Sequence, residues 1–146
     1  MPRRPTDTVP TPPRRLLVVD DNRDSAESMC LIYRDAGHEV RTVHEGAAAV
    51  DAAAQLNADA VLLDIGLPDI DGYEVARRLR SDPRTCGVLI IAISGYGRED
   101  DVRKGREAGI DDHVMKPIDP DKVLERVARG RGEDRNAAGK PAGKGC

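Results

Sequence analysis

The stretch AVLLDIGLPDIDGYEV, residues 60–75, places an aspartate directly after four apolar residues. Such a run is typical of a strand that is covered on both faces, as in a parallel sheet. The strand is expected to end at Asp64, because the Gly and Pro residues that follow favour a turn. A carboxylate at the end of a buried strand is costly to desolvate unless a cation lies beside it. The stretch therefore predicts both a parallel sheet and a cation, or a cation site, near Asp64.

Four further apolar runs accompany this strand, and helical patterns separate them. The runs are LLVVD (16–20), EVRTV (39–43), VLIIAIS (88–94) and DHVMK (112–116), and the helical segments are 24–37, 45–56, 73–81, 98–109 and 119–130. In the first helical segment, apolar residues recur at i, i+3, i+4 and i+7 before Gly37. Five successive β-α units predict an α/β fold with one doubly wound parallel sheet.

The composition indicates one domain between two polar tails. Residues 15–130 hold all the patterned segments, whereas residues 1–14 are rich in Pro and Arg and residues 131–146 in Gly, Ala and Lys. We expect both tails to be disordered. Residues 16–130 carry 15 basic and 23 acidic side chains, and this net charge of −8 disfavours direct DNA binding. No apolar run is long enough for a membrane helix or a signal peptide.

Three widely spaced cysteines, Cys30, Cys86 and Cys146, form no CxxC pair. An odd number without metal-binding spacing indicates reduced thiols and a cytoplasmic protein. Cys30 and Cys86 are interpreted as small packing residues, with redox chemistry or metal binding as the less favoured alternative.

Polar side chains follow the apolar runs at four places: Asp20 and Asp21, then Asp64, Ser94 and Lys116. Because the carboxyl ends of parallel strands meet at one edge of the sheet, we expect these five side chains to converge there. Three clustered carboxylates repel one another and favour a divalent cation, and all-oxygen ligation suits Mg²⁺. A carboxylate beside Mg²⁺ and a lysine can act as a nucleophile toward phosphorus.

Four fragments together make the chain resemble the receiver domain of two-component response regulators, which takes a phosphoryl group from a histidine kinase onto an aspartate. They are LLVVDDN (16–22), VLLDIGLPDIDG (61–72), AISGYG (92–97) and DHVMKPI (112–118). The resemblance implies a flavodoxin-like sheet of five parallel strands in the order 2-1-3-4-5, with five helices. It also implies a signalling module that catalyses only its own phosphorylation and dephosphorylation, not an enzyme with a separate substrate.

Carried over position by position, the resemblance assigns roles to residues around one site. Asp64 matches the phosphoacceptor, Lys116 the lysine that pairs with a phosphoryl oxygen, and Ser94 the hydroxyl residue that turns toward the phosphoryl group. The implied Mg²⁺ ligands are Asp20, Asp21, Asp64 and the backbone carbonyl of Gly66. The implied loop-shaping residues are Pro68, Asp71, Gly72 and Pro117, and the Lys116-Pro117 bond is usually cis in the family.

Receiver switching pairs the hydroxyl residue with an aromatic ring in the fifth strand, and here His113 occupies that position. An imidazole can rotate inward as an aromatic ring does, but it titrates near neutrality. We therefore hypothesise that the inward burial of His113 depends on pH.

Simpler interpretations exist for most of these residues. Asp20 and Asp21 could cap the first helix, Ser94 could cap the fourth, and Lys116 could be an ordinary surface lysine. Asp64 has no such alternative, because capping does not require a charge at the end of so apolar a strand.

The sixteen residues after Gly130 are too few for an output domain, so we expect the chain to act through a partner. The partners implied are a histidine kinase or phosphotransfer protein, an unknown downstream protein, and a second copy bound through the fourth helix, fifth strand and fifth helix. One alternative is a phosphorylation-independent interaction module of receiver fold. Another, an aspartyl phosphatase of the haloacid dehalogenase type, is disfavoured because Gly66 stands where a second acid is expected.

Overall fold

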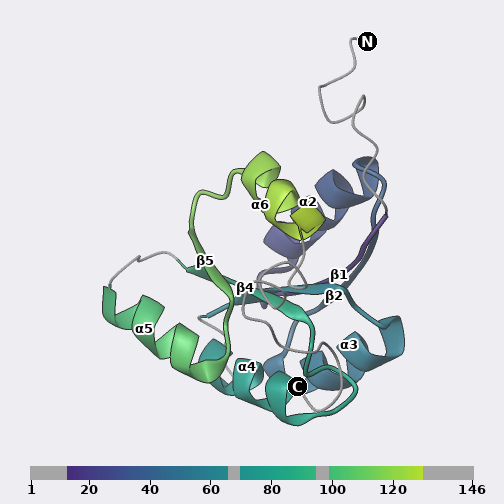
Figure 1. Cartoon of the computed structure of the whole chain (residues 1–146). Coiled ribbons are helices and arrows are strands. Elements are labelled where there is room, and N and C mark those ends of the chain that lie inside the picture. The colour runs from purple at the N-terminus through teal and green to yellow at the C-terminus, as the bar shows by residue number, and fades with distance from the viewer. Residues whose placement is uncertain (1–12, 66–69, 95–98, 130–146) are drawn as a thin grey trace.

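A five-stranded parallel sheet forms the centre of the molecule, with helices on both of its faces (Figure 1). The computed structural model describes residues 13–65, 70–94 and 99–129, without the side chains of residues 99–102. The strands are β1 (Arg15–Val19), β2 (Glu39–Val43), β3 (Ala60–Asp64), β4 (Leu89–Ser94) and β5 (Asp112–Met115). The helices are α2 (Arg23–Asp35), α3 (Ala49–Leu56), α4 (Gly72–Ser81), α5 (Glu99–Ala108) and α6 (Pro120–Arg129), with the 3-10 turn η1 (Gly46–Ala48).

The strand order is β2-β1-β3-β4-β5 and every neighbouring pair is parallel. The expected flavodoxin-like fold is therefore confirmed. Successive side chains of a strand point to opposite faces of the sheet. In the central strands both sets of side chains are buried, because helices cover both faces. Leu17 and Val61 pack in the core that α3 and α4 cover, whereas Leu16 and Leu62 pack in the core beneath α2 and α6. Figure 1 shows these two helical layers above and below the sheet.

Most element boundaries differ from the sequence prediction by one or two residues, as at the end of β1, and the start of α3 differs by more. β1 ends at Val19 rather than Asp20, because the Asp20 carboxylate accepts the backbone N–H of Asn22 (2.9 Å) and the chain turns there. The helix expected over residues 45–56 begins with η1 and becomes α-helical only at Ala49. α6 begins at Pro120, where the missing N–H of proline costs nothing.

The cysteines depart from the sequence prediction. Cys30 is a buried free thiol, but Cys86 is disulfide-bonded, so the expectation of reduced thiols is wrong for Cys86. Spacing along the chain carries no information on which thiols meet in space. None of the helices in the three described ranges is long and apolar enough to cross a membrane. The tails assigned at the two ends lie outside the described residues, apart from Pro13 and Arg14.

Candidate functional site

Three carboxylates gather where β1 and β3 end. Val19 lies opposite Leu63 in the parallel register. The residues that follow them, Asp20 and Asp64, therefore lie next to each other. One carboxylate oxygen from each of Asp20, Asp21 and Asp64 lies within 4.8 Å of the other two. Asp20 and Asp64 are only 2% and 8% exposed, whereas Asp21 is open to solvent. The predicted convergence of these acids is confirmed.

The Asp20 carboxylate is held in a fixed position. Its Oδ1 accepts the Asn22 N–H, and its backbone N–H donates to the Val43 carbonyl (3.1 Å). Burial raises the pKa of Asp20 above its usual value, and the neighbouring Asp64 raises it further, against the lowering effects of the Asn22 N–H and Lys116. A bound cation would relieve this cost of holding two carboxylates together in a buried place.

Lys116 supplies the cation that the first strand pattern required. It follows β5 directly, and its Nζ lies 3.6 Å from Asp64 Oδ2, with 43% of the lysine side chain exposed. Its backbone N–H donates to the Ser94 carbonyl (2.9 Å), which ties the end of β5 to the end of β4. The peptide bond to Pro117 is cis, as the resemblance implied. The Lys116 ammonium thus lies beside the nearly buried carboxylate of Asp64.

Ser94 ends β4 beside the carboxylates and also contacts β5. In the β3–β4 register Asp64 lies opposite Ile93, one residue before Ser94. The Ser94 hydroxyl lies 2.9 Å from Nε2 of His113, so the two residues share a hydrogen bond. The other ring nitrogen, Nδ1, is buried and has no hydrogen-bond partner within the described ranges.

The start of α4 closes against the end of β3. Asp71 caps this helix by accepting the Glu74 N–H (2.8 Å), so its carboxylate serves the turn. The Gly72 N–H donates to the Ile65 carbonyl, and a Cβ on Gly72 would lie 2.8 Å from the Ile65 Cα and 3.1 Å from the Asp64 carbonyl oxygen. Glycine thus permits this close approach. Gly66 and Pro68 lie outside the described residues.

Sequence reasoning missed two residues that contact Asp20. Asn22 caps α2, because its side chain accepts the Ser25 N–H (3.0 Å). The interpretation of Asp20 and Asp21 as caps of this helix is therefore wrong. A polar residue before a helical pattern is a recognisable cap signal. His44, whose Nδ1 lies 3.0 Å from the Asp20 carbonyl oxygen, is 24 residues away in sequence and carries no such signal.

The donor set fits a hard divalent cation. Three carboxylates supply oxygen ligands from two strand ends, and the exposed Asp21 leaves one side open to water, which Mg²⁺ retains in most protein sites. Carboxylate oxygens within 4.8 Å of one another are close enough to share one ion.

Comparisons with known proteins agree with this arrangement. The sequence model of the response regulator receiver domain family matches residues 16–128. The DNA-binding response regulator MtrA of Mycolicibacterium paratuberculosis is 38% identical over 126 residues, which cover 86% of this chain and 55% of MtrA. The dual master transcriptional regulator RpaA of Synechocystis is 33% identical, over 77% of this chain and 47% of its own length. The chain thus spans about half the length of these relatives.

Solved structures show the same fold. A putative response regulator from Chloroflexus aurantiacus matches with a TM-score of 0.74 and 36% identity, over 81% of this chain and 97% of that one. The receiver domain of the sensor histidine kinase PA1611 of Pseudomonas aeruginosa matches with a TM-score of 0.70 and 30% identity, over 83% of this chain and 99% of that one. That structure holds a magnesium ion coordinated in its active site cleft.

Proposed function

Because this chain belongs to the response regulator receiver domain family, we propose that Asp64 is its phosphoacceptor in a two-component phosphorelay. Phosphorylation of an aspartate is standard for this family. The observation that carries the assignment to Asp64 is its place among the charges: two other carboxylates within 4.8 Å and the Lys116 ammonium at 3.6 Å. We propose 15–130 as the receiver domain.

In the proposed reaction, an Asp64 carboxylate oxygen attacks the phosphorus of a phosphohistidine on a histidine kinase or phosphotransfer protein. The P–N bond breaks, its electron pair leaves with the imidazole, and an acyl phosphate remains on Asp64. Lys116 Nζ pairs with a phosphoryl oxygen. Asp20, Asp21 and Asp64 and, by the family resemblance, the Gly66 carbonyl would hold Mg²⁺, which would supply positive charge against the phosphoryl oxygens. The module acts on no separate substrate; water later hydrolyses the acyl phosphate.

The test is the intact mass of the protein after incubation with acetyl phosphate, with and without Mg²⁺. We expect one phosphoryl adduct that requires Mg²⁺ and disappears in Asp64→Ala. Asp24→Asn, which alters an acidic residue in the first turn of α2, is the matched control and should keep the adduct. If neither acetyl phosphate nor a panel of phosphorylated histidine kinases gives an adduct, the proposal fails in favour of a phosphorylation-independent interaction module.

We assign the conformational switch to Ser94 and His113. When the Ser94 hydroxyl turns toward a phosphoryl group, it gives up its 2.9 Å hydrogen bond to His113 Nε2. Both ring nitrogens then need new partners, because Nδ1 already has none among the described residues, so the ring is expected to move. Ser94→Ala should keep the adduct and lose the shift of the His113 ring resonances that phosphorylation causes. A shift of equal size in Ser94→Ala would refute this coupling.

Output is proposed to go through a protein partner. The curated relatives are named as DNA-binding regulators, but this chain matches only about half of their length. We propose that the acidic receiver itself does not contact DNA, and that a second copy binds through α5, β5 and α6, where Met115 is 52% exposed. We also propose a cytoplasmic location, where histidine kinases donate phosphoryl groups. Size-exclusion chromatography with and without acetyl phosphate tests the proposed dimer.

A further inference from the structure

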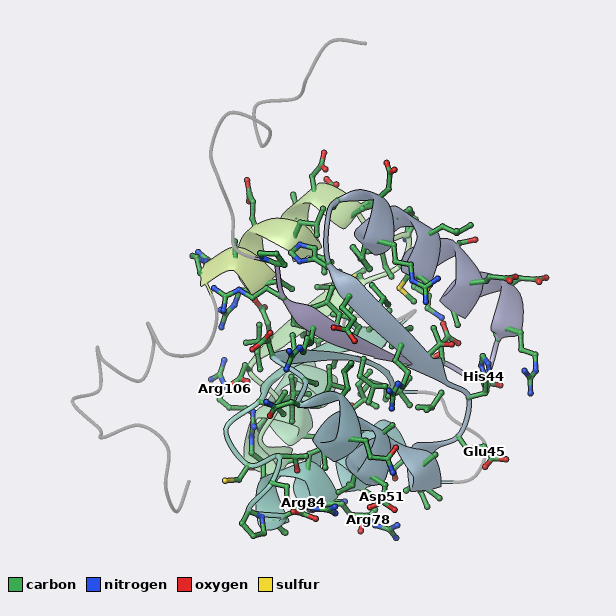
Figure 2. All side chains as sticks on the ribbon, turned by 90° about the vertical axis from the view of Figure 1, so that its right-hand side faces the viewer. His44, Glu45, Asp51, Arg78, Arg84 and Arg106 are labelled. Carbon is green, nitrogen blue, oxygen red and sulfur yellow. The ribbon has the colours of Figure 1, made fainter. Side chains whose placement is uncertain are left out.

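The peptide group between Asp20 and Asp21 is attached to the edge strand β2. The Asp20 carbonyl oxygen lies 3.0 Å from His44 Nδ1, and since a carbonyl only accepts, Nδ1 carries the proton. The Asp20 N–H donates to the carbonyl of Val43. Two consecutive residues at the end of β2 therefore bind both backbone groups of Asp20. Figure 2 labels His44 where the β2 arrow ends.

This contact controls the geometry of two carboxylates at once. The Asp20 carbonyl oxygen and the Asp21 nitrogen and Cα belong to one planar peptide unit. A hydrogen bond to that oxygen therefore sets the rotation of the unit, and with it the direction in which the Asp21 side chain leaves the backbone. The Asp20 carboxylate is oriented separately, by the Asn22 N–H at 2.9 Å.

Regular secondary structure does not hold this peptide unit. Asp20 lies after the last residue of β1 and before Asn22, the residue that caps α2. Neither a strand ladder nor a helix supplies a regular donor to a carbonyl in that position. The side chain of His44 fills the role, and it is only half-buried, so packing alone does not explain its contact.

We propose that His44 is a positioning residue of the cation site: it holds the Asp20-Asp21 peptide so that both carboxylates face the same ion. His44 does not ligate the ion and takes no part in phosphoryl transfer. The inference rests on the proposed function, since it assumes that these carboxylates bind Mg²⁺.

The test compares three variants, His44→Asn, His44→Gln and His44→Ala, by calorimetric titration with Mg²⁺ alone. The amide nitrogen of Asn stands at the same number of bonds from Cβ as Nδ1, whereas that of Gln is one bond further. We expect His44→Ala and His44→Gln to bind Mg²⁺ roughly two- to tenfold more weakly, and His44→Asn to stay within about twofold of the wild type.

Melting temperature in EDTA is the second measurement. A merely structural His44 would lower the melting temperature of all three variants and leave their Kd for Mg²⁺ equal to that of the wild type, and that result overturns the inference. Equal Kd values for the Asn and Gln variants would overturn it too. If the wild type itself binds no Mg²⁺ and forms no adduct, the proposed function fails together with the inference. If the wild type does both and His44→Gln binds Mg²⁺ equally well, the inference alone fails.

Discussion

Arg80→Ala is expected to destabilise the protein far more than Arg78→Ala, although both residues lie on α4. The Arg80 guanidinium joins α4 to two segments, the one that precedes β4 and the one that follows α5. It donates to the carbonyls of Gly109 (2.9 Å), Cys86 (2.9 Å) and Val88 (2.6 Å) and to Asp111 Oδ2 (2.7 Å). Asp111 Oδ2 also accepts the Ile90 N–H (2.9 Å), so the arginine reaches the sheet through a second contact.

The magnitude follows from burial. The Arg80 and Asp111 side chains are 15% and 14% exposed, so truncation would leave a nearly buried carboxylate and three carbonyls without this donor. Breaking such a pair costs about 3–5 kcal/mol, and the residual exposure favours about 3 kcal/mol. Arg78, 48% exposed, pairs with Glu74, 39% exposed, and Figure 2 shows it at the surface of α4. An exposed pair contributes less than about 1 kcal/mol.

The assay is urea unfolding followed by circular dichroism in EDTA, which keeps metal binding out of the measurement. With about 3–4 °C per kcal/mol for a domain of this size, Arg80→Ala should also melt about 10 °C lower. Equal free energies of unfolding for the two variants would refute the reasoning. So would a loss of less than about 1 kcal/mol in Arg80→Ala with an unchanged m-value, since that loss is typical of an exposed pair.

Three further variants test other sites. Burial, and then the Arg14 charge, lower the pKa of His38 below 6.5, so the unfolded state binds more protons than the folded state. The contribution of neutral His38 to stability is therefore complete above pH 6.5 and is lost as the pH falls toward the folded-state pKa. His38→Gln should flatten the profile of melting temperature between about pH 5 and 8. Burial raises the pKa of Tyr33 to about 12, and its hydroxyl lacks a partner among the described residues. Tyr33→Phe should therefore gain about 1 kcal/mol in urea unfolding, and a loss would argue against an unpaired hydroxyl. Gly72→Ala should push α4 away from the Asp64 carbonyl and weaken Mg²⁺ binding in calorimetry; unchanged affinity would show that the loop absorbs the methyl group.

The sheet could be predicted because its pattern is local. Runs such as AVLLD, ending in Asp64, are apolar on both faces and are separated by helical periodicity, so strand count, helix count and the parallel arrangement follow from the chain alone. Strand order came from resemblance to a family. The positions of Asp20, Ser94 and Lys116 could be anticipated as well, since each ends or follows a strand, and parallel strands bring their carboxyl ends together.

Other features were beyond sequence reasoning because they depend on segments distant in the chain. Nothing local marks His44 as the partner of the Asp20 carbonyl, or Arg80 as the donor to carbonyls after α4 and α5. The state of Cys86 was predicted wrongly for the same reason, since spacing does not reveal which thiols approach each other.

The sequence by itself determined which residues are strands and helices and which acids stand at strand ends, because hydrophobic periodicity and turn residues act over a few positions. Only the tertiary structure decided how those acids are held: which backbone groups orient Asp20, which atom of the His113 ring bonds to Ser94, and how close the Lys116 ammonium lies to Asp64. Such contacts are set by the register and packing of whole elements. Their geometry is fixed only once the sheet has formed.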